Sequence, residues 1–219
     1  MVDRPDGQRK LHSRIVPLTG GPVVLISLFV GLGTTLWIHP TLLQATAGDI
    51  RFLVSLAIAG ILIVTLGILD DKFGLRGRQK LFGQFLVALI MLPSGIAIRK
   101  IQVFGIPLEF GDFSAIVTVF WILGAINALN LIDGVDGLAS TIGIVLSLSV
   151  AGVTAILGGR DDGLMISLAL AGSLTGFLCF NFPPARMFLG DSGSMLIGLV
   201  VGCVALKCSF KQYAAVALV

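Results

Sequence analysis

The chain has 219 residues, a formal net charge of +3 and a mean hydropathy of +1.01. Apolar residues make up 56% of it and charged residues only 12%, which excludes a soluble domain of ordinary composition. The composition therefore predicts an integral membrane protein, and we expect no nucleic-acid partner.

Long apolar runs recur along the chain, and each approaches the ~20 residues that a helix needs to cross a bilayer core. They predict an all-α, polytopic helix bundle with about seven spans, in a single membrane domain over 1–219. The first 18 residues are polar and basic, unlike a cleaved signal peptide, so we expect the chain to begin in a loop. The apolar runs are 19–38, 52–69, 80–98, 113–130, 138–158, 164–182 and 194–210.

Because spans alternate in direction, four polar loops are expected on one side of the membrane. This side carries nine of the 15 lysines and arginines, so the positive-inside rule predicts that it is cytoplasmic. The same loops hold the unusual residues of the sequence. They are 1–18, 70–79, 131–137 and 183–193.

Aspartates stand at the ends of several apolar runs. An ionised side chain in hydrocarbon costs several kcal/mol, so acids left there indicate a functional site. Asp70 and Asp71 are adjacent, and a carboxylate pair with substrate phosphates suits Mg²⁺. The alternative is a set of interfacial ion pairs with the cations that follow, Lys72, Arg76, Arg78 and Lys80.

One segment repeats a polar residue at every third position: Asn127, Asn130, Asp133 and Asp136. On a helix this step keeps neighbouring side chains near one face, as far as Asp133. Gly134 and Gly137 then loosen the backbone, which lets Asp136 turn back toward the same site. The spacing excludes an EF-hand, and polar hydrogen bonds between helices remain the alternative.

Asp191 is expected at the N-terminus of the last span, because Pro183-Pro184 ends the span before it. Backbone N–H groups at a helix N-terminus attract anions, and Ser192 or Ser194 can cap the helix or donate to phosphate. A purely capping role for Asp191 is the alternative. The basic residues Arg9, Lys10 and His12 of the first loop suit pyrophosphate or anionic lipid.

Other features of the apolar runs predict helix packing. Gly198 and Gly202 form a GxxxG pattern, which favours close helix contact. Cys179, Cys203 and Cys208 lack metal-ligand spacing and are expected to be buried or lipid-facing thiols.

Four ordered segments together resemble the polyprenyl-phosphate N-acetylhexosamine-1-phosphate transferases. The segments are DRPDGQRKLHSRIVPLTGG, DDKFGLRGRQKLFGQ, NALNLIDGVDGLA and PARMFLGDSGS. The resemblance implies transfer of a sugar-1-phosphate from a UDP-N-acetylhexosamine to undecaprenyl phosphate, with release of UMP. RKLH followed by PLTGG looks more like the bacterial branch that uses UDP-N-acetylglucosamine than the branch that uses UDP-N-acetylmuramoyl-pentapeptide.

The resemblance also implies roles for individual residues. Asp70 and Asp71 match the catalytic acid pair, and Asp191 is the third catalytic residue and binds Mg²⁺ (or Mn²⁺) together with Asp71. Lys80 and Gln84 match a polar pair on the next helix. The substrate-binding residues are expected to be Arg9, Lys10, His12, Lys80, Asn127, Asn130, Asp133, Asp136 and Ser192.

Members of the family carry a further span before the first motif loop, and further spans with a histidine-rich loop after the last motif. The sequence therefore leads us to expect a fragment, a truncated product or a divergent member in the inner (cytoplasmic) membrane. A homodimer is a possible assembly of the chain. Competing classes are a transporter, which would place its acids nearer the middle of the membrane, and a remnant that binds nucleotide or lipid phosphate without turnover.

Overall fold

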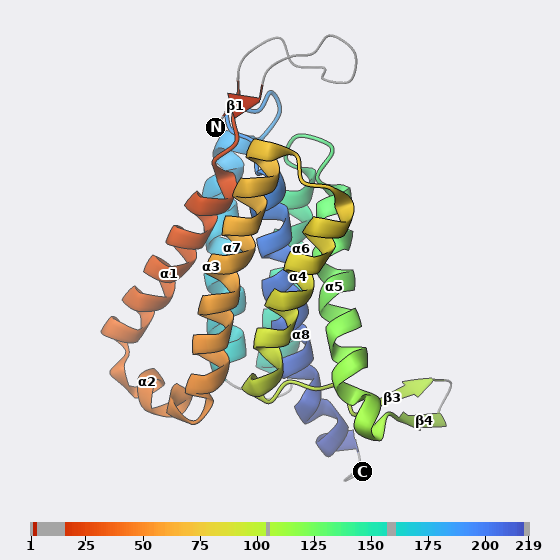
Figure 1. Ribbon diagram of the computed structural model, residues 1–219. Coiled ribbons are helices and arrows are strands. Elements are labelled where there is room, and N and C mark those ends of the chain that lie inside the picture. The colour runs from red at the N-terminus through yellow and green to blue at the C-terminus, as the bar shows by residue number, and fades with distance from the viewer. Residues whose placement is uncertain (1, 4–15, 104–105, 157–160, 217–219) are drawn as a thin grey trace.

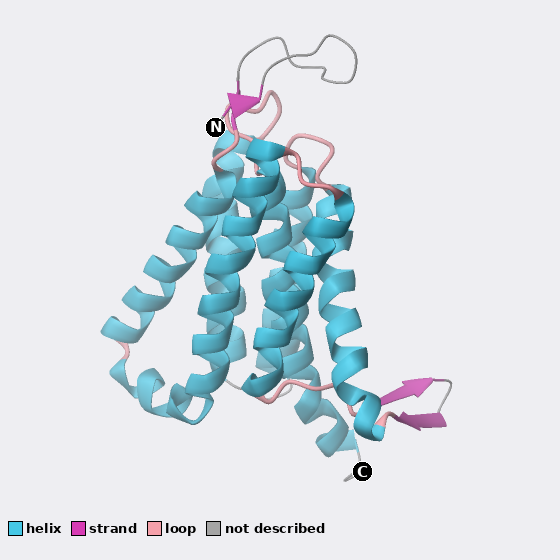
Figure 2. Ribbon diagram, viewed as in Figure 1, coloured by secondary structure: helices cyan, strands magenta, loops and turns pink. Residues whose placement is uncertain are grey.

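The computed structural model describes residues 2–3, 16–103, 106–156 and 161–216. Within these ranges helices dominate, and the strands form two short antiparallel pairs at opposite ends of the bundle (Figures 1 and 2). The pairs are β1 (Val2–Asp3) with β2 (Val16–Pro17) and β3 (Lys100–Val103) with β4 (Ile106–Glu109). The α-helices are α1 (Gly20–Ile38), α2 (Pro40–Thr46), α3 (Ile50–Phe73), α4 (Gly77–Met91), α5 (Ser114–Ile132), α6 (Leu138–Ile156), α7 (Asp161–Asn181) and α8 (Gly190–Val216).

The expected helical membrane bundle is confirmed. Among the described residues, six helices are long and apolar enough to cross a membrane: α1, α3, α5, α6, α7 and α8. The expected run 80–98 is the exception, because α4 begins at Gly77 and ends at Met91 after 15 residues. Pro93 and Gly95, with φ 86°, end the helical path there. α4 still runs between the two ends of the bundle, so the alternation of loops is preserved (Figure 1).

Helix α8 lies at the centre of the bundle and packs against α1, α3, α5 and α6. Met195, Leu196 and Ile197 in its first half are fully buried. Outward-facing residues of other helices remain exposed and apolar, such as Phe120 and Leu131 on α5, as expected for surfaces that face lipid.

The GxxxG prediction for α8 is confirmed by its contact with α5. A Cβ atom built on Gly198 would lie 2.5 Å from the Ala125 carbonyl oxygen, so only glycine permits this approach. At Gly202 the main-chain carbonyl accepts a hydrogen bond of 3.1 Å from Trp121 Nε1. The two helices are thus held close enough for side chains at their ends to meet.

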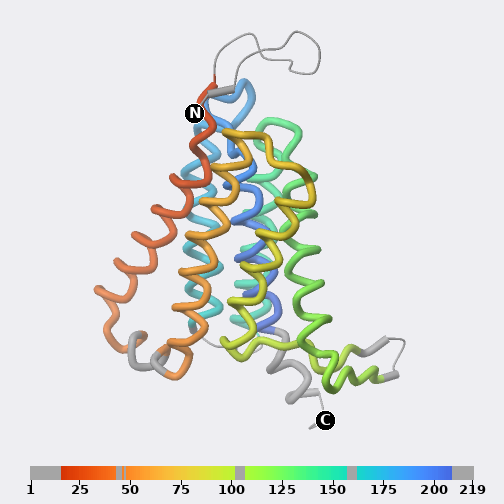
Figure 3. Tube along the Cα trace, in the orientation of Figure 1, coloured from red at the N-terminus to blue at the C-terminus, as the bar shows by residue number. Residues whose placement is uncertain are grey.

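The connections α3–α4, α5–α6 and α7–α8 lie at one end of the bundle, together with β2, and β3–β4 lies at the other end (Figures 1 and 3). Phe188 donates its N–H to the Pro17 carbonyl at 3.0 Å, and Gly20 donates to the Phe188 carbonyl at 3.1 Å. The predicted grouping of the motif loops on one side is therefore confirmed for the described residues. Arg9, Lys10 and His12 lie outside them.

Candidate functional site

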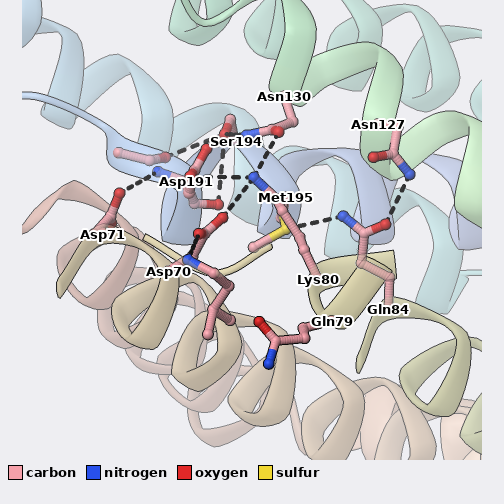
Figure 4. Close-up of polar contacts among 12 residues, drawn as sticks. Asp70, Asp71, Gln79, Lys80, Gln84, Asn127, Asn130, Asp191, Ser194 and Met195 are labelled. Carbon is pink, nitrogen blue, oxygen red and sulfur yellow. Dashed lines mark hydrogen bonds and ion pairs between the residues drawn. The ribbon is translucent and has the colours of Figure 1, made fainter. Parts of the chain in front are cut away.

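Lys80 is the centre of the polar site at the motif end of the bundle (Figure 4). Its Nζ lies 2.8 Å from Asp70 Oδ2 and 3.1 Å from Asp191 Oδ2. It also donates to Asn130 Oδ1 at 2.9 Å. An ammonium group has three donors, so these three acceptors use all of them. We call Lys80, Asp70, Asn130 and Asp191 the Lys80 cluster.

Four helices supply this cluster: Asp70 lies in the last turn of α3, Lys80 in the first turn of α4, Asn130 in the last turn of α5 and Asp191 in the first turn of α8. Asn130 links the last two helices. Its Nδ2 donates to Asp191 Oδ1 and, at 3.0 Å, to Ser194 Oγ. The amide therefore accepts a hydrogen bond from Lys80 through its oxygen and donates hydrogen bonds to α8 through its nitrogen, which fixes its orientation.

Asp70 and Asp71 are adjacent in the chain but have different partners. They were expected in a loop, yet α3 continues to Phe73, and both acids lie in its last turn. The helix ends at Gly74, which has φ 61° and donates its N–H to the Asp70 carbonyl at 2.7 Å. Consecutive helical residues point about 100° apart, so the two carboxylates diverge.

Asp70 is fully engaged. Its Oδ1 accepts the N–H of Leu75 at 2.8 Å, and its Oδ2 pairs with Lys80. The ion-pair alternative considered for the sequence thus holds for Asp70, with Lys80 as the partner. Lys72 instead lies over the ring of Phe73, with Nζ 5.0 Å from the ring centroid.

Asp71 reaches the N-terminus of α8. Its Oδ1 accepts the backbone N–H of Asp191 at 3.0 Å, so α3 caps α8. Its Oδ2 is buried and has no hydrogen-bond partner among the described residues. Gly190 leaves room for this oxygen, because it adopts φ 71° and a Cβ there would lie 2.7 Å from Asp71 Oδ2. Asp191 lies at the predicted helix N-terminus.

Asp133 and Asp136 follow α5 in the loop that leads to α6. Asp133 has no hydrogen bond or ion pair to another described residue. Burial, and after it the nearby charges of Asp191, Asp71 and Asp136, together raise the pKa of its carboxyl to about 7. Asp136 was expected to turn back toward the same site. Its side chain reaches the loop that precedes α8, where it accepts the N–H of Ala185 at 3.0 Å.

Asn127 lies one turn deeper than Asn130. Its Nδ2 donates to Gln84 Oε1 at 2.8 Å, and the fully buried Gln84 donates to Met195 Sδ at 3.2 Å. This network lies beside the Lys80 cluster in Figure 4, one helical turn further into the bundle on α4 and α5. Lys80 and Gln84, the polar pair expected on one helix, both lie on α4. Lys80 belongs to the Lys80 cluster, and Gln84 belongs to the network with Asn127 and Met195.

The side chain of Ser192 faces α1. It is fully buried, and its Oγ packs where a Cβ of Gly21 would stand. Its expected role in substrate binding stays a prediction. Asn181 was not predicted as a functional residue; it hydrogen-bonds to the α5–α6 connection and to the α7–α8 connection. The only local signal is a single amide at the end of an apolar run, just before Pro183.

The donor set fits a magnesium ion held by few protein ligands. Among the described residues, no three acidic, cysteine or histidine side chains converge into a ready-made metal cluster. Mg²⁺ usually binds one or two carboxylates and completes its shell with waters and substrate phosphates. Within the described part of the chain Asp71 Oδ2 has no partner, Asp133 is unpaired and Asp191 is about one third exposed, so carboxylate oxygens remain for such an ion.

Comparison with known proteins gives matches along most of the chain. The sequence pattern of glycosyl transferase family 4 matches residues 53–209. The chain is 35% identical over 217 residues to a probable undecaprenyl-phosphate N-acetylglucosaminyl 1-phosphate transferase of Bacillus subtilis (strain 168). This alignment covers 96% of the chain and 56% of the relative.

A second relative is the phospho-N-acetylmuramoyl-pentapeptide-transferase of Streptococcus pyogenes serotype M5 (strain Manfredo). The two are 36% identical over 212 residues, which cover 92% of the chain and 62% of the relative. The chain thus spans between about half and two thirds of the length of these curated relatives.

Proposed function

Because the chain belongs to glycosyl transferase family 4, we propose that it transfers N-acetylhexosamine-1-phosphate from a UDP-sugar to undecaprenyl phosphate. The membership confirms the resemblance drawn from the four motifs. GlcNAc-1-phosphate is the proposed group, since the Bacillus subtilis relative is named for it. The products are a lipid-linked pyrophosphoryl sugar and UMP, the first intermediate for a cell-wall or surface polysaccharide.

The Lys80 cluster is the observation that carries this proposal. Four helices bring two carboxylates, one ammonium and one amide to a single point at the end of the bundle. Asp71 and Asp133 add two carboxylates around it. A transporter would place its acids nearer the middle of the membrane, whereas these lie at helix ends on one side.

In the proposed reaction, an oxygen of the lipid phosphate attacks the sugar-bearing phosphorus of the UDP-sugar. A new P–O–P linkage forms, the bond to the UMP oxygen breaks, and UMP leaves with the electron pair. A phosphate monoester has a second pKa near ~6, so the lipid phosphate is mostly dianionic at neutral pH and requires little help from a base. Bringing two anions together is then the main task.

The residues of the site suit that task by position and charge. Lys80 holds Asp70 and Asp191 in fixed directions and supplies one positive charge. Asp70 or Asp71 positions the acceptor, and a covalent aspartyl-phosphate is the less favoured variant because Asp70 is occupied by Lys80 and Leu75. Asp133, Asn130 and Asn127 are the residues proposed to contact the nucleotide.

Asp191 and Asp71 are the proposed ligands of Mg²⁺, which when bound neutralises phosphate charge and polarises the phosphorus. Mn²⁺ is a substitute with the same oxygen preference. The motif end is proposed to face the cytoplasm, where UDP-sugars are made, and the chain to lie in the inner membrane. The side chains that favour this orientation include Lys72, Arg76, Arg78 and Arg186.

Release of labelled UMP from UDP-N-acetylglucosamine tests the proposal. Membranes that contain only this chain would be incubated with undecaprenyl phosphate and Mg²⁺, beside matched membranes with Asp191→Asn. We expect turnover in the first and its loss in the second. Absence of UMP release from a folded chain that still binds UDP-sugar would favour a remnant without turnover and reject the transferase.

The second candidate is the use of UDP-N-acetylmuramoyl-pentapeptide as the donor. The 36% identity to the Streptococcus pyogenes protein favours it. The same assay with this donor separates the two, because each predicts the larger kcat/KM for its own UDP-sugar.

A further inference from the structure

Asn181, at the end of α7, connects the loop that carries Asp133 to the loop that precedes Asp191. Its Oδ1 accepts the N–H of Gly137 at 3.1 Å and the hydroxyl of Ser140 at 2.8 Å. Its Nδ2 donates to the Met187 carbonyl at 3.0 Å. The residue is 4% exposed, and its bonds to Gly137 and Ser140 are buried.

These contacts lie close to the site in both directions along the chain. Gly137 follows Asp133 by four residues, and Met187 precedes Asp191 by four residues. A second bond joins the same two loops, from the Ala185 N–H to Asp136 Oδ2. The α5–α6 loop, residues 133–137, is therefore fastened to the 182–189 loop at two points.

The 182–189 loop is also closed upon α7. Arg186 and Met187 both donate their N–H groups to the Phe180 carbonyl, at 2.8 and 3.1 Å. Movement of the Asn181 amide would consequently shift the backbone on either side of it. None of the three partners of Asn181 belongs to the Lys80 cluster, so its influence on the carboxylates must pass through the loops.

We propose that Asn181 is a positioning residue, a clasp that holds the 133–137 loop against the 182–189 loop so that the carboxylates of Asp133 and Asp191 face one space. The inference rests on the proposed transferase function. Asn181 does not touch substrate. A side-chain shift of about 1 Å at reacting groups can cost a hundredfold in rate, so a loose clasp would act on turnover more than on folding.

The variants are Asn181→Ala, which loses three bonds, and Ser140→Ala, which loses one. Ser147→Ala is the matched control, because Ser147 is equally buried on α6 and its hydroxyl has no partner among the described residues. Spin labels on cysteines placed at Val135 and Arg186, both exposed, would report the separation of the loops. Cys179→Ser and Cys208→Ser would remove the accessible native thiols.

For Asn181→Ala we expect a longer and broader label distance, a kcat for UMP release about a hundredfold lower and a much smaller change in KM. Ser140→Ala should lie between this variant and the control. Unchanged label distances in Asn181→Ala would overturn the clasp. So would separated loops with a kcat equal to that of Ser147→Ala.

A wild-type chain without turnover would reject the proposed function. The positioning role of Asn181 is then tested separately, by measuring the affinity of the chain for Mn²⁺ with electron paramagnetic resonance. Loss of a group that orients metal ligands weakens metal affinity about tenfold or more. Affinity that is weaker by this factor in Asn181→Ala and unchanged in Ser147→Ala supports the clasp, and equal affinity in both overturns it.

Discussion

Removing the charge of Lys80 separates its structural role from its chemical role. In Lys80→Met the two carboxylates lose their common partner, and the Asn130 amide loses a donor. The side chains of Asp70 and Lys80 are only 8% and 16% exposed, so their ion pair is largely shielded from solvent. At 2.8 Å it gains about 6 kcal/mol at an effective dielectric constant of about 20, before desolvation is subtracted.

The net cost is smaller than this gross attraction. Breaking a buried pair from one side costs ~3–5 kcal/mol, because an uncompensated charge remains. The pair with Asp191 adds less than about 1 kcal/mol, since that side chain is 34% exposed. We expect Lys80→Met to lose about 3 kcal/mol of unfolding free energy, measured by denaturant unfolding in detergent micelles with circular dichroism.

The double variant Lys80→Met, Asp70→Asn gives the decisive comparison. The amide that replaces the Asp70 carboxylate is neutral and can still accept the Leu75 N–H, so most of the lost stability should return. UMP release should stay at least about a hundredfold below wild type in both variants, because a charged group of the site is missing. Lys72→Met, an exposed change at the end of α3, is the control. The reasoning fails if Lys80→Met unfolds like Lys72→Met, or if the double variant is no more stable than the single one.

Three further outcomes are expected. The pKa of Asp133 is raised to about 7, so between about pH 4 and 7 the folded chain holds a proton that the unfolded chain has released, and the free energy of unfolding falls as pH rises through this window. The variant Asp133→Asn, unfolded with denaturant at pH 5 and at pH 8, should lack this fall. A pH dependence equal to that of the wild type would contradict the raised pKa of Asp133. Gly190→Ala should lower the free energy of unfolding by ~1–2 kcal/mol, because alanine is strained at a φ of 71°, and it should lower activity by moving Asp71. The control is Gly33→Ala, which has no atom near its Cβ and should be neutral or stabilising in the same unfolding assay. Gly198→Ala should cost ~1–3 kcal/mol, because its Cβ meets the Ala125 carbonyl; Gly172→Ala, which faces open space, is its control, and equal stability of the two would refute the packing argument.

Most of the helices could be predicted from the sequence, but their ends could not. The run 80–98 was expected to be one span, and α4 stops at Met91 because Pro93 and Gly95 follow. Asp70 and Asp71 were expected in a loop, and α3 continues through them to Phe73. Apolar composition marks which residues enter the membrane, whereas a helix end depends on caps and contacts that hydropathy does not measure.

The roles of the acids divide in the same way. The spacing of motifs identified the carboxylates that meet at one end of the bundle. It did not distinguish Asp70, which pairs with Lys80, from Asp71, which caps α8. The role of Asn181 could not be predicted from the sequence, because its three hydrogen bonds reach residues at the start of α6 and in the loop before α8.

The sequence by itself determined that this chain is a bundle of membrane helices with its acids at one end, because hydrophobicity and the alternation of spans are properties of consecutive residues. Only the tertiary structure decided which acid pairs with which donor. Asp71 and the Asp191 N–H are 120 positions apart, and Asn130 and Asp191 are 61 apart. Their contact depends on the close packing of α3, α5 and α8, which brings distant helix ends together.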